Sequence, residues 1–375
     1  MRIALVDTYY RRFLTKHYAD HPSLESESYD DQRKSLIGAR FGTSDFYSKH
    51  LDDLGCEAVD LIANCAPLQM AWLKENGLGS SALNFPIPHR FYRTPIIGST
   101  LAALPGFVSV VAAQIRSFKP DILYCHDLSF FPKQILKALK QHVRLIVGQI
   151  AYVLPPRNFV EGYDLILTSF PHFVPTLKAA GISSEYFRLG FDPRVAGDLD
   201  AGPRDIDVSF VGAIGRSHRN AVPLLERLCH ETSIRIYGYG AEDLPTDSPI
   251  LKRYEKEVWG LEMYRILGRS KITLNRHIAV AANYANNMRL YEATGMGALL
   301  LTDEKDNLTD LFEPGREIET YSDPQEAVEK ISALLRDPDR LARIAAAGRA
   351  RTLREHTYQT RMKELLEILN RYLRK

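Results

Sequence analysis

The fold is decided by the stretch Lys271-Ile-Thr-Leu-Asn-Arg-His277 and, after a short loop, Asn286-Asn-Met-Arg-Leu-Tyr-Glu-Ala-Thr-Gly-Met-Gly-Ala-Leu-Leu-Leu-Thr-Asp303. The first segment is an apolar run that ends in polar side chains, which is typical of a buried strand at its carboxyl end. In the second segment Asn286 or Asn287 is a suitable N-cap for a helix, and another apolar run follows that helix. A strand, a helix and a strand in this order predict a parallel α/β sheet.

The same alternation of short apolar strands and longer helical patterns continues along the whole chain. It predicts an α/β fold of two Rossmann-like halves that face one another across a cleft, with ligands beyond the carboxyl ends of the strands. The expected strands are Arg2–Val6, Ala58–Ile62, Ile122–Cys125, Arg144–Gln149, Leu165–Thr168, Tyr186–Leu189, Val208–Gly212, Ile234–Tyr237, Ile272–Asn275, Ala298–Thr302 and Glu317–Tyr321. The expected helices are Phe46–Leu54, Leu68–Glu75, Leu101–Phe118, Lys133–Lys140, Phe173–Ala180, Val222–His230, Leu261–Gly268, Met288–Thr294, Pro324–Leu335 and a long stretch from Asp337 to Tyr372.

A segment rich in Gly, Pro and Asp lies near the midpoint, and its composition is that of a linker. We place this linker at residues 193–205. It separates an N-terminal domain over residues 1–192, with an insert at about 9–40, from a C-terminal domain over residues 206–355. We expect the last segment, residues 356–375, to be a helix that returns to the N-terminal domain.

The composition excludes several classes of protein. Of 375 residues, 45% are hydrophobic and 25% are charged, which is close to the average for globular proteins and excludes a disordered or collagen-like chain. Lys and Arg number 48 against 46 Asp and Glu, so no global basic field indicates nucleic acid as a partner. The four cysteines form no C-x-x-C pair, which favours reduced thiols over a disulfide scaffold or a zinc ribbon.

One apolar stretch, Ile96 to Ile115, is long enough to raise the question of a membrane span. It is interrupted by polar residues, Pro105 and Gly106, whereas a span needs about 20 mostly apolar residues. The N-terminus meets Asp7 too early for a signal peptide. We therefore expect a cytoplasmic protein without a transmembrane segment, for which peripheral contact with a membrane stays open.

The helix that begins near Asn287 has the features of an anion site. The free backbone N–H groups of a helix start, at Asn287 and Met288, attract an anion such as a diphosphate. Arg289 in the first turn adds a guanidinium suited to phosphate, and Glu292 one turn later shares its face and suits the two hydroxyls of a ribose. The alternative is that Arg289 and Glu292 form only a surface ion pair.

Two other loops follow strands and offer groups to an anion. The loop Gly212-Ala-Ile-Gly-Arg-Ser-His-Arg219 contains two glycines together with Arg216 and Arg219, which suit a pyrophosphate; the alternative is a plain turn with solvated arginines. The loop at Gly42, Thr43 and Ser44 precedes a helix that Thr43 or Ser44 can cap; the alternative is a capping turn without a ligand.

Candidates for proton transfer lie in the first half of the chain. His126 and Asp127 follow the strand Ile122–Cys125, and we expect one of the two side chains to face the cleft, although a structural role for His126 is the alternative. Asp45 is a third candidate base. The acidic residues are too scattered for a metal cage, so the sequence predicts no metal site and no cofactor.

At these residues the sequence resembles GT-B glycosyltransferases, and in particular the CgeB-like (spore maturation protein) group of family-1-type transferases. The resemblance is strong over about Val208–Arg361 and weaker over the first half, where it consists mainly of the order of elements. The segments that carry it are Asn287–Ala293, Gly297–Asp303, Phe312–Glu317, His356–Tyr358 and Val208–Gly212 with Arg219.

The resemblance implies roles for individual residues on the side that binds a nucleotide-sugar donor. Glu292 matches the glutamate that binds the donor ribose, and Arg216 or Arg219 matches the basic residue on the pyrophosphate. The amides of Asn287 and Met288 match those that face the donor phosphate and sugar, and Trp259-Gly260 matches the loop near the nucleobase. Related retaining enzymes carry a second glutamate where this chain has Tyr284, so we expect the sugar contact from elsewhere, with His277 as the candidate.

The function that follows is transfer of a sugar from a nucleotide-diphosphate sugar to a glycan, protein or lipid-linked acceptor, without a metal ion. The N-terminal domain, with Gly42, Thr43 and Ser44, is expected on the acceptor side. If the reaction inverts the anomeric configuration, a base is needed among His126, Asp127 and Asp45. A nucleotide-sugar epimerase and a non-catalytic nucleotide-sugar-binding or assembly protein are the two alternatives.

Overall fold

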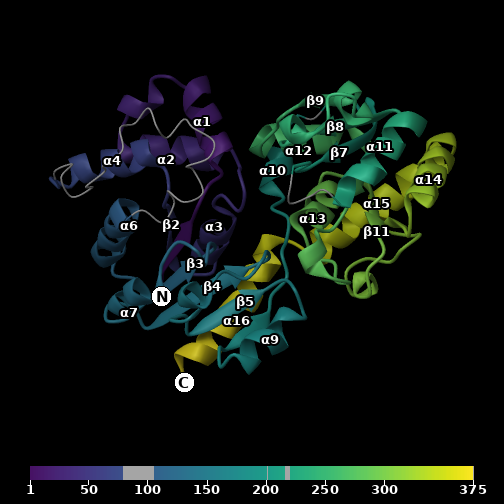
Figure 1. The fold of residues 1–375 in the computed structure, drawn as a ribbon. Coiled ribbons are helices and arrows are strands. Elements are labelled where there is room, and N and C mark those ends of the chain that lie inside the picture. Colours follow the sequence, from purple (N-terminus) through teal and green to yellow (C-terminus); the bar gives the residue numbers. More distant parts are fainter. Residues whose placement is uncertain (79–104, 201, 216–219, 375) are drawn as a thin grey trace. The chain divides into compact units, whose positions relative to one another are not determined.

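A computed structural model describes residues 1–78, 105–200, 202–215 and 220–374 of the chain (Figure 1). The chain divides into two compact units. The first is Met1–Phe187 together with Met362–Lys375, and the second is Arg188–Arg361. Each unit is described separately below.

The first unit contains a parallel six-stranded sheet in the order β2-β1-β3-β4-β5-β6 among the described residues. Its strands are β1 (Arg2–Asp7), β2 (Glu57–Ile62), β3 (Ile122–Cys125), β4 (Leu145–Ile150), β5 (Leu165–Thr168) and β6 (Ser184–Tyr186). Its helices are α1 (Arg11–Asp20), α2 (Tyr29–Gly38), α3 (Phe46–Asp53), α4 (Ala66–Glu75), α6 (Pro105–Phe118), α7 (Lys133–Leu139), α8 (Arg157–Val160) and α9 (Phe173–Ala179).

The central strands of this sheet are covered on both faces. Every residue of β3, β4 and β5 is buried, as expected of parallel strands with helices packed on either side. The sequence itself indicates this burial, because β5 is the nearly continuous apolar run Leu-Ile-Leu-Thr and not an alternation of apolar and polar residues.

The insert at residues 9–40 is helical, which the strand and helix patterns did not predict. It contains α1 and α2, and Ser28 caps α2 by accepting a hydrogen bond from the Asp31 amide. Both helices are short and polar on average, and the apolar periodicity of α2 is weak. The expected helix Leu101–Phe118 lies outside the described residues at 101–104, and α6 covers the remainder.

The second unit contains another parallel six-stranded sheet, in the order β12-β11-β10-β7-β8-β9 among the described residues. Its strands are β7 (Ile206–Val211), β8 (Ile234–Tyr237), β9 (Tyr254–Lys256), β10 (Ser270–Asn275), β11 (Leu299–Asp303) and β12 (Glu319–Tyr321). Its helices are α10 (Arg194–Gly197), α11 (Val222–Glu231), α12 (Gly260–Arg269), α13 (Met288–Gly295), α14 (Pro324–Arg336) and α15 (Pro338–Glu355).

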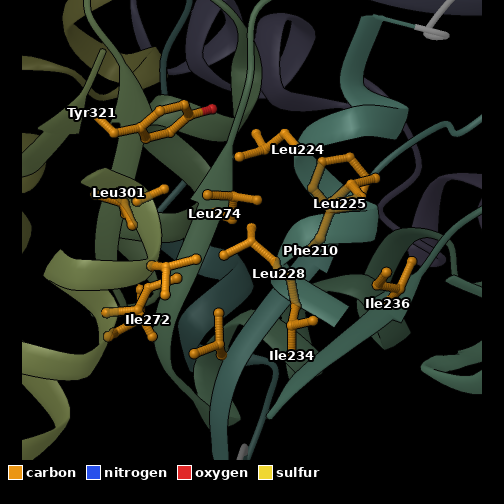
Figure 2. Packing of buried hydrophobic residues seen from close by; sticks show 14 of the residues in the cluster. Phe210, Leu224, Leu225, Leu228, Ile234, Ile236, Ile272, Leu274, Leu301 and Tyr321 are labelled. Carbon is orange, nitrogen blue, oxygen red and sulfur yellow. The ribbon is translucent and has the colours of Figure 1, made fainter. Parts of the chain in front are cut away.

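A large apolar cluster of the second unit lies on one face of its sheet. Figure 2 shows Leu224, Leu225 and Leu228 of α11 directed at strand residues that include Ile272 and Leu274. Helices α14 and α15 complete this face. The opposite face carries small polar residues, with hydroxyl contacts from Ser209 to Ser270 at 2.8 Å and to Thr273 at 3.2 Å, and α12 and α13 pack on β7, β10 and β11.

The structure adds three details about the element boundaries. The long terminal stretch is two helices, α15 and α16 (Tyr358–Leu373), because the backbone of His356 and Tyr358 bonds Phe191 in a short bridge and interrupts the helical ladder. The linker segment at 193–205 contains α10 and belongs to the second unit. Strand β9 was not predicted, since only three residues, two of them charged, form it at a sheet edge.

No helix within the described residues is long and apolar enough to cross a membrane.

We expect Leu225→Ala to lower the free energy of unfolding by about 2–5 kcal/mol, because the side chain is fully buried and its removal leaves a cavity. Urea unfolding followed by circular dichroism measures the loss. Leu353→Ala is the matched control: Leu353 is 38% exposed on α15, and we expect a loss of less than about 1 kcal/mol. Equal losses in the two variants would contradict the assignment of the core.

Candidate functional site

The second unit has a topological switch point between β7 and β10. Strands β8 and β9 continue the sheet on one side of this pair, and β11 and β12 continue it on the other. The loops that follow β7 and β10 therefore leave the sheet in opposite directions, and the crevice between such loops is where parallel α/β sheets bind ligands. Residues from both loops, including Ala213 and His277, line a small cavity of about 30 Å³.

A buried carboxylate, that of Glu292, lies on α13 beside this switch point. Its side chain is only 5% exposed. The Arg289 guanidinium donates to Oε2 at 2.7 Å, and the Tyr264 hydroxyl donates to Oε1 at 3.2 Å. Burial and the neighbouring charge of Glu292 raise the pKa of Tyr264, so its hydroxyl stays protonated as a donor. Each carboxylate oxygen can accept two hydrogen bonds, so each retains capacity for one more donor.

Arg289 is engaged within the unit. Besides Glu292, its guanidinium donates to the Val211 carbonyl at 3.2 Å and lies 3.3 Å from the Met263 sulfur. The pair with Glu292 that the sequence allowed therefore forms, but it is buried rather than on the surface. In this arrangement Arg289 fixes the carboxylate of Glu292.

Asn287 is the N-cap of α13, as one of the two predicted alternatives required. Its side-chain oxygen accepts from the Leu290 amide, and its amide nitrogen donates to Asn275 at 2.9 Å. Asn275 in turn donates to the Thr302 hydroxyl at 2.9 Å. The start of α13, with the amide of Met288, is thus fixed to the ends of β10 and β11.

His277 lies two residues beyond the end of β10 and is buried. Its Nδ1 lies 2.7 Å from Asp303 Oδ1 at the end of β11, and its backbone amide donates to the same oxygen at 3.1 Å. Its Nε2 is buried and has no hydrogen-bond partner. Tyr284, the residue at the place of the missing glutamate, is half-buried in the loop before α13.

The loop at Trp259 and Gly260 precedes α12. The Trp259 ring stacks on Tyr239 with centroids 5.1 Å apart, and its indole N–H donates to Glu257 at 2.9 Å. Gly260 has φ +50°, a conformation that glycine adopts without strain. The two stacked rings provide a flat apolar surface at the end of β8.

The loops after β7 and β8 pack backbone against backbone. A Cβ atom on Gly238 would lie 1.9 Å from the Gly212 carbonyl oxygen, and one on Gly240 would lie 2.3 Å from the Gly215 nitrogen. Glycine is therefore required at both positions of the β8 loop. Arg216 and Arg219 lie outside the described residues, and the pyrophosphate role expected of them stays a prediction.

A cluster of oxygen-bearing side chains follows β1 and β3 in the first unit, at that sheet's own switch point. The Thr43 hydroxyl donates to Asp7 at 3.1 Å, and the Thr8 hydroxyl donates to Asp127 at 2.8 Å. Desolvation by burial, with a smaller contribution from the charge of Asp127, raises the pKa of Asp7 to about 7. Asp127 also accepts from the Ser129 amide.

His126 is packed among aromatic rings beside this cluster. The Tyr47 ring centroid lies 4.7 Å from its own, edge to face, and that of Tyr124 lies 5.1 Å away. Desolvation lowers the pKa of His126 to about 4 despite a hydrogen bond to Gln149, so the ring is neutral at pH 7. Both tyrosine hydroxyls donate to Gln149 Oε1, which fixes this wall of the site.

The residues after Gly42 were predicted to cap the following helix, and the structure differs from this prediction. Neither Thr43 nor Ser44 caps α3, because the Thr43 hydroxyl bonds Asp7 and the Ser44 hydroxyl bonds the Ile37 carbonyl. Asp45 forms an ion pair with Arg40 at 2.5 Å. Gly42 has φ +59° and Ser44 has φ +45°, so the loop turns sharply before the helix.

The sequence analysis missed three residues of these sites. Asp7 was visible as an acid at the end of a buried strand, and Asp303 as the last residue of another. Tyr264 carried no local signal, because its contact with Glu292 joins positions 28 apart in the chain. Within the described residues, no group of three or more His, Cys, Asp and Glu side chains is arranged to hold a metal ion.

Residues 216–367 match the family described as "Glycosyl transferase-like". A search of curated proteins finds no match. Among solved structures, sucrose-phosphate synthase from Thermosynechococcus elongatus superimposes with a TM-score of 0.60 at 11% identity, covering 99% of this chain and 98% of that one. HepE from Anabaena in complex with UDP-glucose gives 0.59 at 12% identity, covering 99% of each chain.

The fold is that of GT-B glycosyltransferases. A third GT-B structure agrees: AviGT4, a glycosyltransferase of avilamycin A biosynthesis, has a TM-score of 0.56 at 14% identity, covering 100% of this chain and 98% of that one. The predicted fold class, α/β with two Rossmann-like domains, is thereby confirmed. The glycosyl transferase-like segment includes α13 with Glu292 and the ends of β10 and β11.

Asp7 is expected to make the free energy of unfolding fall as the pH rises. Its folded pKa of about 7 exceeds the ordinary value of 3.8, so between these pH values the folded state holds the proton more tightly than the unfolded state does. Asp7→Asn should remove this contribution, and the variant should gain stability relative to wild type as the pH rises from 4 to 7.

Urea unfolding at pH 5, 6, 7 and 8 measures this difference. Asp30→Asn, at an exposed position on α2 of the same unit, is the control and should leave the pH profile unchanged. His126 has the opposite effect on stability, because its lowered pKa increases the free energy of unfolding as the pH rises from about 4 to 6.5. His126 is present in both the wild type and Asp7→Asn, so its contribution cancels in the difference between them. A wild-type profile parallel to that of Asp7→Asn would contradict the assignment.

Proposed function

We propose that this protein is a glycosyltransferase that moves a sugar from a nucleotide-diphosphate sugar to a glycan, protein or lipid-linked acceptor. The observation that carries the proposal is the buried carboxylate of Glu292 beside the switch point of the second unit. The match of residues 216–367 to a glycosyl transferase-like family and the GT-B fold support it. Membership of the CgeB-like group, transfer of a hexose and a cytoplasmic location are part of this proposal.

The carboxylate of Glu292 suits a pair of vicinal hydroxyls. Arg289 and Tyr264 occupy one hydrogen-bonding position on each oxygen, and these contacts fix the carboxylate in one orientation. The two remaining positions accept hydrogen bonds from the 2′- and 3′-hydroxyls of the donor ribose. Hydrogen bonds to a charged acceptor in a buried site are worth about 1.5–3 kcal/mol each.

The charge of the diphosphate is met by groups at the strand ends. The amides of Asn287 and Met288 at the start of α13 present a positive dipole end. Arg276, at the end of β10, makes no hydrogen bond or ion pair with any described residue, and Arg216 and Arg219 follow β7 in the sequence. Trp259 and Gly260 are assigned to the nucleobase, as in the enzymes that the sequence resembles.

The first unit supplies the acceptor side, with Gly42, Thr43 and Ser44 at its edge. Of the three candidate bases, His126 is neutral at pH 7 and can accept a proton, whereas Asp45 is already paired with Arg40. We assign His126 the role of base if the reaction inverts, with Asp127 as its neighbour at the end of β3. Proton NMR of the anomeric product distinguishes inversion from retention.

Thermal-shift titration against UDP-, GDP-, dTDP- and CDP-sugars tests the donor site. We expect one nucleotide class to raise the melting temperature of the wild type, and Glu292→Gln to weaken that donor roughly tenfold or more, because the charged acceptor is lost. Glu329→Gln, on exposed α14 surface, is the matched control and should bind as the wild type does. Binding that survives Glu292→Gln unchanged would contradict the proposed site.

Turnover assays with the donor alone separate the proposal from its alternatives. A glycosyltransferase hydrolyses the donor slowly and consumes it rapidly only with an acceptor. Rapid turnover of the donor alone into its epimer would indicate an epimerase. Binding without turnover across a broad panel of acceptors would indicate a non-catalytic binding protein.

The reaction is expected to proceed without a divalent cation, because backbone amides and arginines meet the charge of the leaving diphosphate. Addition of EDTA should therefore leave kcat/KM unchanged within a factor of about two. A loss of activity with EDTA that Mg²⁺ or Mn²⁺ restores would contradict this part of the proposal.

A further inference from the structure

In addition to Glu292, the second unit contains a buried histidine, His277, whose ring lies against a carboxylate. The side chain of His277 is 1% exposed, and its Nδ1 faces Asp303 Oδ1 at 2.7 Å. Burial acts to raise the pKa of Asp303, but hydrogen bonds from the ring and the backbone amide of His277, together with the charge of Lys305, hold it below its usual range. Asp303 is therefore an ionised acceptor, and Nδ1 carries the proton that it donates to Asp303.

The other ring nitrogen of His277 is left as an acceptor. The negative charge of Asp303 is already compensated by the Lys305 ammonium at 3.2 Å, and Arg276 adds a further positive charge on the preceding residue. A neutral ring with its proton on Nδ1 has a bare lone pair on Nε2.

Nε2 has no partner in the structure, although it is buried. Buried polar atoms of native proteins are almost always satisfied, so an exception indicates a missing partner. His277 lines the cavity of about 30 Å³ at the switch point, together with Phe210, Ala213 and Ile278. On this measure about 10–15 Å³ is enough to hold one water molecule, so the cavity has room for a hydroxyl-sized group.

We infer that His277 and Asp303 form a specificity site in which Nε2 accepts a hydrogen bond from a hydroxyl of the transferred sugar, with Asp303 as the positioning residue. This inference rests on the proposed function. A phosphate oxygen is excluded as the partner, because it offers no proton to an unprotonated nitrogen. The ligand class is thus a nucleotide-linked sugar with a free hydroxyl at this position, and not the nucleoside diphosphate alone.

A chain of hydrogen bonds connects this pair to the start of α13. Asp303 Oδ1 lies 3.3 Å from the Thr302 hydroxyl, which accepts from Asn275, which accepts from the N-cap residue Asn287. The same chain that fixes the helix amides for a phosphate therefore fixes the imidazole for the neighbouring sugar. One network of hydrogen bonds therefore positions both the group proposed to contact the sugar and the groups proposed to contact the phosphate.

Two-bond ¹H–¹⁵N NMR of the ¹⁵N-histidine-labelled full-length protein tests the hydrogen-bonding state without any ligand. His277→Gln assigns the His277 signals, and His230→Gln, at an exposed position on α11, is the matched control. We expect a protonated Nδ1 and an unprotonated Nε2 for His277 at pH 7.5. A protonated Nε2 would overturn the inference, whatever the protein binds.

Calorimetric titration with a nucleotide sugar and with its nucleoside diphosphate, UDP-glucose and UDP, then tests the ligand class. If the thermal-shift panel selects GDP, dTDP or CDP, the corresponding sugar and diphosphate are used instead. For His277→Gln we expect the dissociation constant of the nucleotide sugar to rise roughly 3- to 10-fold and that of the nucleoside diphosphate to stay unchanged. For Asp303→Asn we expect binding of the nucleotide sugar to weaken more than binding of the nucleoside diphosphate. Equal weakening of both ligands would overturn the inference, because a structural defect affects both. If the wild type binds no nucleotide sugar, the proposed function fails, and the NMR result still decides the state of His277.

Discussion

The buried carboxylate of Glu292 determines which residues must surround it in the second unit. An ionised group removed from water has to be paired and hydrogen-bonded, and Glu292 meets this requirement through Arg289 and Tyr264. Arg289 is in turn fixed by the Val211 carbonyl at the end of β7. The pair therefore ties α13 to α12 and to the central strand of the sheet. Loss of one partner would leave a buried charge uncompensated, which typically costs about 3–5 kcal/mol.

The second unit separates the residues that stabilise it from those that we assign to the ligand. A large apolar cluster joins the sheet to helices α11, α14 and α15, and Figure 2 shows its members on α11 and on the strands. The polar network lies at the carboxyl ends of β10 and β11. The start of α13, the N-cap Asn287 and the pair of His277 and Asp303 belong to one set of hydrogen bonds. Such a set holds its members in one geometry, as preorganised binding of a charged and polar ligand requires.

The sequence predicted the elements well where apolar runs were long or fully buried. The bounds of β3, β5 and β8 agree to the residue, and the N-cap of α13 is one of the two asparagines expected. The failures have physical causes. Helices α1 and α2 are polar on average, α2 lacks a clear apolar period, and β9 is three residues at a sheet edge. The cause of the break between α15 and α16 is not local either, because it depends on Phe191, more than 160 positions earlier.

The candidate site was predictable only in part, for the same reason. Asn287, Arg289 and Glu292 lie within about one and a half helical turns, so local spacing brought them together. The contacts of Tyr264 with Glu292, of Asp303 with His277 and of Thr43 with Asp7 join residues 26 to 36 positions apart, and only the fold places them side by side. The hydroxyl of Thr43 was predicted to cap a helix because a distant carboxylate was not part of the local pattern.

The most direct test of the central claim is a thermodynamic cycle between Glu292 and the ribose. Calorimetry measures the binding of UDP and of 2′,3′-dideoxyuridine diphosphate, or the equivalent pair for another base, to the wild type and to Glu292→Gln. The account predicts a coupling free energy of about 1 kcal/mol or more, so that removal of the hydroxyls weakens binding to the wild type far more than to the variant. A coupling free energy of zero, with both proteins equally sensitive to the loss of the hydroxyls, would contradict it.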